Sequence, residues 1–280
     1  MANETNIWQD VDGNWTNTAN WSRGSAPAAT EHVYILDGTQ DIETNVDQNT
    51  TDLSSLRIGS QFTGDIGKSG GPLKIGAAEV LVAGGGEVWL QGKTGVDLPL
   101  VNVDKAQWTD NSVVLAGFIG EVNVYRGRVE IAAGVDTDAT LRFRALWKTR
   151  RDSDAYLVIG TPTAVITSVT LLGGRVTGSL GITTVNLHGG HFSQTAGNLA
   201  TLHLYDGLCS WTSSGTIKDA WAFGGVFDAR KNKDKSGPPT ITTLRQFPGA
   251  VVDLRTEADN ITVTNTETYA CKGPLLGLEI

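Results

Sequence analysis

Four consecutive segments decide the fold, and the first of them reads Val169-Thr-Leu171-Leu-Gly-Gly174-Arg-Val176. All four follow the pattern apolar-x-apolar-x-x-Gly-x-apolar, and the other three are Val185-Asn-Leu187-His-Gly-Gly190-His-Phe192, Leu202-His-Leu204-Tyr-Asp-Gly207-Leu-Cys209 and Ala220-Trp-Ala222-Phe-Gly-Gly225-Val-Phe227. Their first residues are 16, 17 and 18 positions apart. Period-two alternation on both sides of the Gly predicts strand, corner, strand, with one face of each strand buried. The Gly allows the positive φ that a sharp corner requires.

This repeat predicts an all-β fold, a single-stranded β-solenoid or parallel β-helix with coils of 16–18 residues. A coil of this length cannot bury its apolar face alone, so neighbouring coils must stack and share a core. Further copies with less even spacing begin at Val80, Val122, Leu244 and, more weakly, Ile261. An antiparallel sandwich or barrel would also show many short strands. That alternative is disfavoured because it does not need a nearly constant period with the Gly in the same phase.

The first 50 residues differ from the repeats. They carry Trp8, Trp15 and Trp21 in polar, Asn-rich surroundings. Because a solenoid has an open apolar end that must be covered, we interpret 1–50 as an N-terminal cap and attachment segment. The tryptophans would plug the core, and an aromatic patch that stacks on a glycan is the alternative. Residues 51–280 form the predicted solenoid, with a charged loop insertion at 230–239.

Charge and composition exclude several classes of function. The formal net charge of −8 disfavours non-specific nucleic-acid binding, and the basic cluster from Arg142 to Arg151 is interpreted as a solvated loop. No apolar run is long enough to cross a membrane, and the polar start lacks the features of an export signal. Cys209 and Cys271 are expected to be free thiols, with Cys209 in the core.

Candidate catalytic and metal-binding residues do not form a convincing constellation. The acidic residues of the repeats are scattered near corners, and only a meeting of Asp206 with Asp228 across coils would supply a carboxylate pair. His188, His191 and His203 could in principle meet at a metal, but His188 and His191 flank a Gly-Gly corner and should point differently. We therefore expect no catalytic residue, no metal, no cofactor and no enzymatic activity.

Aromatic residues are the better candidates for contacts with a partner. Trp211 and Trp221 could lie close together on adjacent coils and, with Tyr205, form a flat surface for a sugar or another subunit. Many such side chains belong to the core instead. The candidate interface residues are Trp8, Trp15, Trp21, Trp211 and Trp221.

The N-terminal quarter resembles the opening of many β-solenoid proteins. The resemblance rests on Gly13-Asn-Trp15, Ala19-Asn-Trp21-Ser, Glu31-His-Val33-Tyr-Ile35, Leu53-Ser-Ser-Leu56-Arg-Ile58 and Phe62-Thr-Gly64-Asp-Ile66-Gly67. Similar openings occur in structural proteins of tailed bacteriophages and in autotransporter-type adhesin passengers. The polar start favours the phage group, because a passenger must be exported.

The resemblance implies a non-enzymatic virion protein that is assembled in the host cytoplasm. We expect a capsid decoration or cement protein that binds and stabilises the phage head, and we expect it to be a homotrimer. The expected partners are the major capsid protein or another virion protein. One alternative is a receptor-binding tail fibre or tailspike that recognises cell-surface polysaccharide, and another is a bacterial adhesin.

Overall fold

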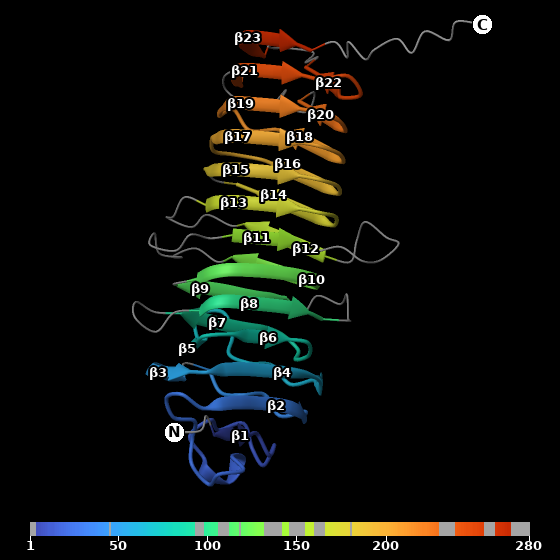
Figure 1. The fold of residues 1–280 in the computed structure, drawn as a ribbon. Coiled ribbons are helices and arrows are strands. Elements are labelled where there is room, and N and C mark those ends of the chain that lie inside the picture. The colour runs from blue at the N-terminus through green and yellow to red at the C-terminus, as the bar shows by residue number, and fades with distance from the viewer. Residues whose placement is uncertain are drawn as a thin grey trace, which may run out of the picture.

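The computed structural model describes residues 4–44, 46–92, 98–105, 112–117, 119–131, 142–145, 155–159, 166–179, 181–229, 239–254 and 261–269. Most of these residues form short strands that are stacked along one axis (Figure 1). The N-terminus lies at one end of the resulting rod and β23 (Thr262–Thr268) lies at the other (Figure 1).

Two parallel sheets run along the rod, and each coil contributes strands to them. The first sheet contains, in stacking order, β1 (Thr5–Ile7), β2 (His32–Gly38), β4 (Ser55–Phe62), β6 (Val80–Val82), β8 (Leu98–Asp104), the first part of β10 (Ile119–Ile131), β11 (Arg142–Ala145), β13 (Ile166–Leu171), β15 (Ile182–Leu187), β17 (Leu199–Leu204), β19 (Thr216–Ala222), β21 (Thr240–Gln246) and β23.

The second sheet is built in the same way. It contains β3 (Asp47–Leu53), β5 (Leu73–Ala77), β7 (Val88–Gly92), β9 (Val113–Gly117), the last part of β10, β12 (Ala155–Ile159), β14 (Arg175–Gly178), β16 (His191–Gln194), β18 (Leu208–Trp211), β20 (Val226–Asp228) and β22 (Val251–Asp253). All of these pairings are parallel, so the predicted β-solenoid is confirmed.

Stacked apolar positions form the core between the sheets. Val169, Val185, Leu202, Ala220 and Leu244 are register partners in successive first-sheet strands, and each is at most 3% exposed. These are the first residues of the repeat copies, so the repeat phase was correctly predicted here. The weak last copy was wrong, because the partner of Leu244 is Thr266 and not Ile261.

Coil length varies more than the repeat predicts. Spacings of 16, 17 and 18 residues hold between Val169 and Ala220, whereas the stacked positions Leu56, Val80, Val101 and Val122 are 21 to 24 residues apart. The copy at Val101 was missed, although Val101-Asn-Val103 repeats the letters of Val122-Asn-Val124. Its corner carries Lys105 instead of a Gly, which hides the pattern.

The corner glycines behave as predicted. The repeat Gly has a positive φ in every described copy, at Gly85, Gly127, Gly174, Gly190, Gly207, Gly225 and Gly249. At Gly207, for example, φ is 85° and an added Cβ would lie 2.5 Å from the carbonyl oxygen of Gly190 in the coil below. Both the φ and the close approach of the coils therefore favour Gly over any other residue.

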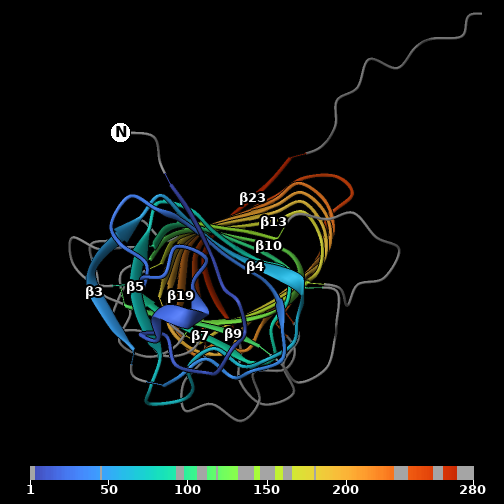
Figure 2. The same cartoon turned by 90° about the horizontal axis from the view of Figure 1, so that it is seen from below.

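An N-terminal segment covers the first coil, and its ribbon crosses the end of the stack (Figure 2). Within it, β1 pairs with β2, and a 3-10 turn, η1 (Thr18–Asn20), follows. The ring of Trp21 makes edge contacts with Trp8 and Trp15, at centroid distances of 5.1 and 4.8 Å. Because β1 already pairs with β2, the parallel ladder begins inside the predicted cap of 1–50, and the described residues that precede β2 are 4–31.

The predicted loop insertion at 230–239 lies, except for Pro239, outside the described residues. The same holds for Cys271, and for the side chains of the basic cluster between Arg142 and Arg151. Cys209 is buried and free, as expected. Burial raises the pKa of its thiol, and the nearby Asp228 adds to this effect.

Candidate functional site

Exposed apolar side chains gather along one edge of the rod. The eight large hydrophobic residues that the structure exposes are Val11, Leu36, Tyr125, Leu172, Tyr205, Val226, Val251 and Tyr269. Leu36, Tyr125, Leu172 and Tyr205 each lie two residues before a Gly with a positive φ. Val226 and Val251 are the first residues of β20 and β22, after the corner, and Tyr269 directly follows β23. Because the coils stack in register, these positions form one line parallel to the axis.

We call the C-terminal part of this line the spine. It comprises the pre-corner residues Leu172, His188, Tyr205, Phe223, Phe247 and Tyr269, and the post-corner residues Leu208, Val226 and Val251. Backbone hydrogen bonds link the pre-corner positions to the coil before, for example from Tyr205 N to Leu187 O at 2.8 Å and from Phe223 N to Leu204 O at 2.8 Å. The ladder of parallel coils therefore fixes where the spine runs.

The rings of the spine stack face to face. Centroid distances are 4.5 Å from His188 to Tyr205, 5.0 Å from Tyr205 to Phe223, 4.6 Å from Phe223 to Phe247 and 4.5 Å from Phe247 to Tyr269. These distances reflect the spacing of neighbouring strands, about 4.8 Å. Each inner ring is thus covered on both faces by its neighbours, and the spine presents ring edges to its surroundings.

A row of polar and aromatic residues lies beside the spine on the same sheet. The guanidinium of Arg245 lies 4.3 Å from the ring centroid of Trp221. It also donates hydrogen bonds to Asp219, at 2.6 Å, and to Glu267, at 3.1 Å. The hydroxyl of Tyr269 donates to the same Glu267 carboxylate at 2.6 Å. This network ties three successive coils together through their outward side chains.

The pKa values of this row follow from these contacts. The hydrogen bond to Asp219 is the main cause that raises the pKa of Arg245. The hydrogen bond from Tyr269 is the main cause that lowers the pKa of Glu267. Burial lowers the pKa of His203, whose Nδ1 lies 2.9 Å from Asn186 Oδ1. Arg245 is paired with Asp219 and Glu267 within the chain, and this pairing holds the charged side chains of the row in place.

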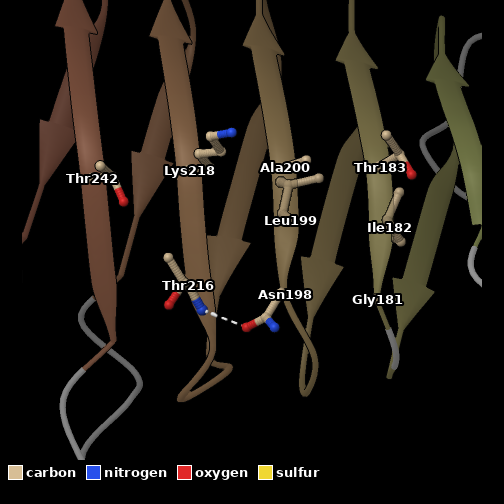
Figure 3. A pocket seen from close by; sticks show the side chains of 9 residues that line it. All are labelled: Gly181, Ile182, Thr183, Asn198, Leu199, Ala200, Thr216, Lys218 and Thr242. Atoms are coloured by element: carbon tan, nitrogen blue, oxygen red, sulfur yellow. Dashed lines mark hydrogen bonds between the residues drawn. The ribbon is translucent and has the colours of Figure 1, made fainter.

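An open groove lies at the other margin of the first sheet, where β15, β17, β19 and β21 begin (Figure 3). It has a volume of about 590 Å³. Thr183, Ala200, Lys218 and Thr242 line it from four successive coils, and the amide oxygen of Asn198 accepts a hydrogen bond from Thr216 N at 2.8 Å (Figure 3). Its lining also includes the apolar Ile182 and Leu199, and Lys218 is its single cation.

Four of the five predicted interface residues are buried in this chain. Trp8, Trp15, Trp21 and Trp211 are at most 2% exposed, so these indoles form core and not a free surface. Trp211 belongs to the second sheet, and Trp221 lies on the outer side of the first. Trp221 thus remains as a surface candidate, next to the spine.

Sequence reasoning missed most of the spine. The sequence pattern singles out Tyr205 as an interface candidate, but not His188, Phe223 and Phe247 as one group. The repeat contains a signal for these rings. His188 and Phe223 directly follow the second apolar position of their repeat copies, and Phe247 directly follows Gln246, which occupies the equivalent position. An alignment of the repeat copies by column would have found it.

Asp206 and Asp228 do not meet, and the three histidines do not converge. Asp206 lies at the corner after β17, whereas Asp228 lies on β20 and is a register partner of Asp253. His188 stacks on Tyr205, and His191 Nε2 lies 3.0 Å from Ser210 Oγ on the second sheet. Among the described residues, no three His, Cys, Asp or Glu side chains are placed to hold a metal ion.

Comparisons of the chain with protein-family models, with curated proteins and with solved structures find no match. Within the described ranges, the chain forms no helix with the length and hydropathy that a membrane crossing requires.

Proposed function

We propose that this protein is a non-enzymatic structural rod of a bacteriophage particle, which decorates and stabilises the head. The observation that carries the proposal is the combination of a continuous parallel ladder with an apolar spine on its flank. In-register strands bury a common core from β2 to β21, which gives a stiff body. The spine then offers protein-docking surface along that body.

The geometry of the rings supports docking of protein over stacking of sugar. A sugar ring stacks on the exposed face of an aromatic ring, whereas the inner rings of the spine have both faces covered by neighbours. One face of Trp221 is taken by Arg245. Ring edges pack well against other side chains, and aromatic residues are frequent anchors of protein interfaces.

We propose that the cap attaches the rod to the head. Val11 is 58% exposed and is the one exposed large hydrophobic residue, among those that the structure describes, that lies away from the line of strand ends and corners described above. Its backbone is held by a hydrogen bond from Val11 N to Asn20 Oδ1 at 2.8 Å. The cap therefore presents an apolar side chain on a fixed loop at the end of the rod.

Cryo-electron microscopy of particles from the native source tests this function. We expect regular copies on the head, with the cap toward the shell. In a binding assay with isolated heads, V11D should bind at least ten times more weakly than wild type, with unchanged thermal stability. N265D, which adds the same charge to an exposed residue of β23 at the opposite end of the rod, is the control. A location at the tail tip, or the absence of the protein from particles, would contradict the proposal.

The groove favours a second candidate, recognition of a cell-surface polysaccharide by a tail fibre or tailspike. Its threonine hydroxyls, the Asn198 amide and Lys218 are groups that bind hydroxyl-rich or acidic chains. Titration calorimetry with host polysaccharide fragments distinguishes the two. Binding that K218A weakens would favour this candidate over head decoration.

A further inference from the structure

The spine and the groove lie on opposite margins of the same sheet and at the same height of the rod. The groove extends over β15, β17, β19 and β21, and the ring stack extends over the coils of β15 to β23. One carries exposed apolar side chains, and the other is an open hollow whose lining includes the apolar Ile182, Leu199 and Ala200. The apolar side chains of the spine therefore match the apolar part of the groove lining.

The pitch of the two surfaces also matches. Both repeat once per coil, with the spacing of about 4.8 Å that separates neighbouring strands. A partner that fills four successive steps of the groove must present a side chain at each step. Another copy of this chain does so with the spine, because its side chains stack with the same spacing.

Charge complementarity supports the same partner. Lys218 is exposed in the groove and makes no ion pair with any described residue. Asp206 is exposed at the crest of the spine, where its carboxylate accepts a hydrogen bond from Gly207 N at 2.7 Å, and it too makes no ion pair with a described residue. The two lie on neighbouring coils, since β17 pairs with β19. A parallel copy at equal height brings one toward the other.

We propose that the spine of each copy lies in the groove of the next, with Asp206 paired to Lys218 across the contact, in a closed ring of parallel copies. The two surfaces differ, so the contact is heterologous and must either close or grow without limit. Two copies that face each other across an axis parallel to the rods, or more copies in a larger ring, fill both surfaces of every copy. The inference rests on the docking role proposed for the spine, and it names a second copy of this chain as the partner.

Charge exchange in the purified full-length protein tests the inference. Sedimentation velocity should give wild type as a closed oligomer of fixed size, built from 29.7 kDa chains. K218E and D206K should each weaken association at least tenfold and give monomer, because each places like charges together. The double variant K218E/D206K should restore the oligomer. K68E makes the same charge change outside both surfaces and should keep the wild-type size.

Circular dichroism and thermal melting show whether each variant is folded, and restoration in the double variant excludes a folding defect as the cause. A monomeric wild type overturns the inference, and so do single variants that keep the wild-type oligomer. Wild-type monomer whose groove binds an added oligosaccharide also overturns it, in favour of the glycan. No phage particle enters this experiment. An oligomer that does not bind heads therefore contradicts the proposed function alone.

Discussion

Lys105 shows how a single residue departs from the rules of the repeat. It stands at a corner, is 3% exposed, and its Nζ donates a hydrogen bond to Gly86 O at 2.5 Å. Burial lowers its pKa to about 8, against the opposing influence of Asp65 and Glu87. A corner that elsewhere uses Gly thus holds a lysine whose charged form is disfavoured.

This lysine makes stability depend on pH. Its folded-state pKa lies below its ordinary value of 10.5, so between about pH 8 and 10.5 the unfolded chain binds more protons. Stability therefore rises with pH across this window. Relative to K105M, the free energy of unfolding of wild type should increase by roughly 3 kcal/mol from pH 7.5 to pH 10.5, as urea denaturation can measure. Parallel pH profiles for the two proteins would contradict the expected burial.

The corner glycines give a second expectation at the residue scale. Gly249 has a φ of 97°, and no atom lies within 4 Å of an added Cβ, so G249A should cost only the left-handed backbone, about 1–2 kcal/mol. G207A adds the clash with the Gly190 carbonyl and should cost on the order of 3 kcal/mol or more. Denaturation midpoints rank the two variants. Equal losses of unfolding free energy in G249A and G207A would mean that neighbouring coils move apart at little cost in free energy.

At the scale of elements, the ring stack joins strands that are far apart in sequence. Phe223 contacts Tyr205 on one face and Phe247 on the other. Each aromatic pair contributes about 0.5–1.5 kcal/mol beyond its buried area, so F223A should lower the free energy of unfolding by roughly 1–3 kcal/mol. F223L retains most of the apolar area and serves as the control. If F223A and F223L lost the same free energy of unfolding, the stacking of the rings would contribute no measurable stability.

The sequence predicted the elements best where coils are short. Between Val169 and Phe227 the alternation and the Gly phase lead directly to the observed register. The prediction failed at Val101 because a lysine occupies the corner, and at Ile261 because Thr266, a polar residue, continues the column. The spine was largely missed because outward positions are not constrained by the core. Their meaning appears only when the coils are stacked.

At the scale of the whole molecule, the cap controls association along the axis. Residues 4–31 cover β2, whose edge would otherwise be free to pair with another chain. A variant that lacks residues 1–31 should therefore associate end to end, with a size that grows with protein concentration in light scattering. Wild type should keep a fixed size. A truncated chain that also keeps a fixed size would show that this edge does not drive association.

The direction of the hydrogen bonds gives the rod an unequal response to force. The strands run across the rod, so the bonds between coils point along it. Tension between the two ends loads these bonds in line and opens the ladder one coil after another, at low force. A pull along the direction of a strand shears all bonds of that strand at once and meets far greater resistance. A rod of this kind bears sideways load best, and neighbours fixed along its flank would share any axial load with it.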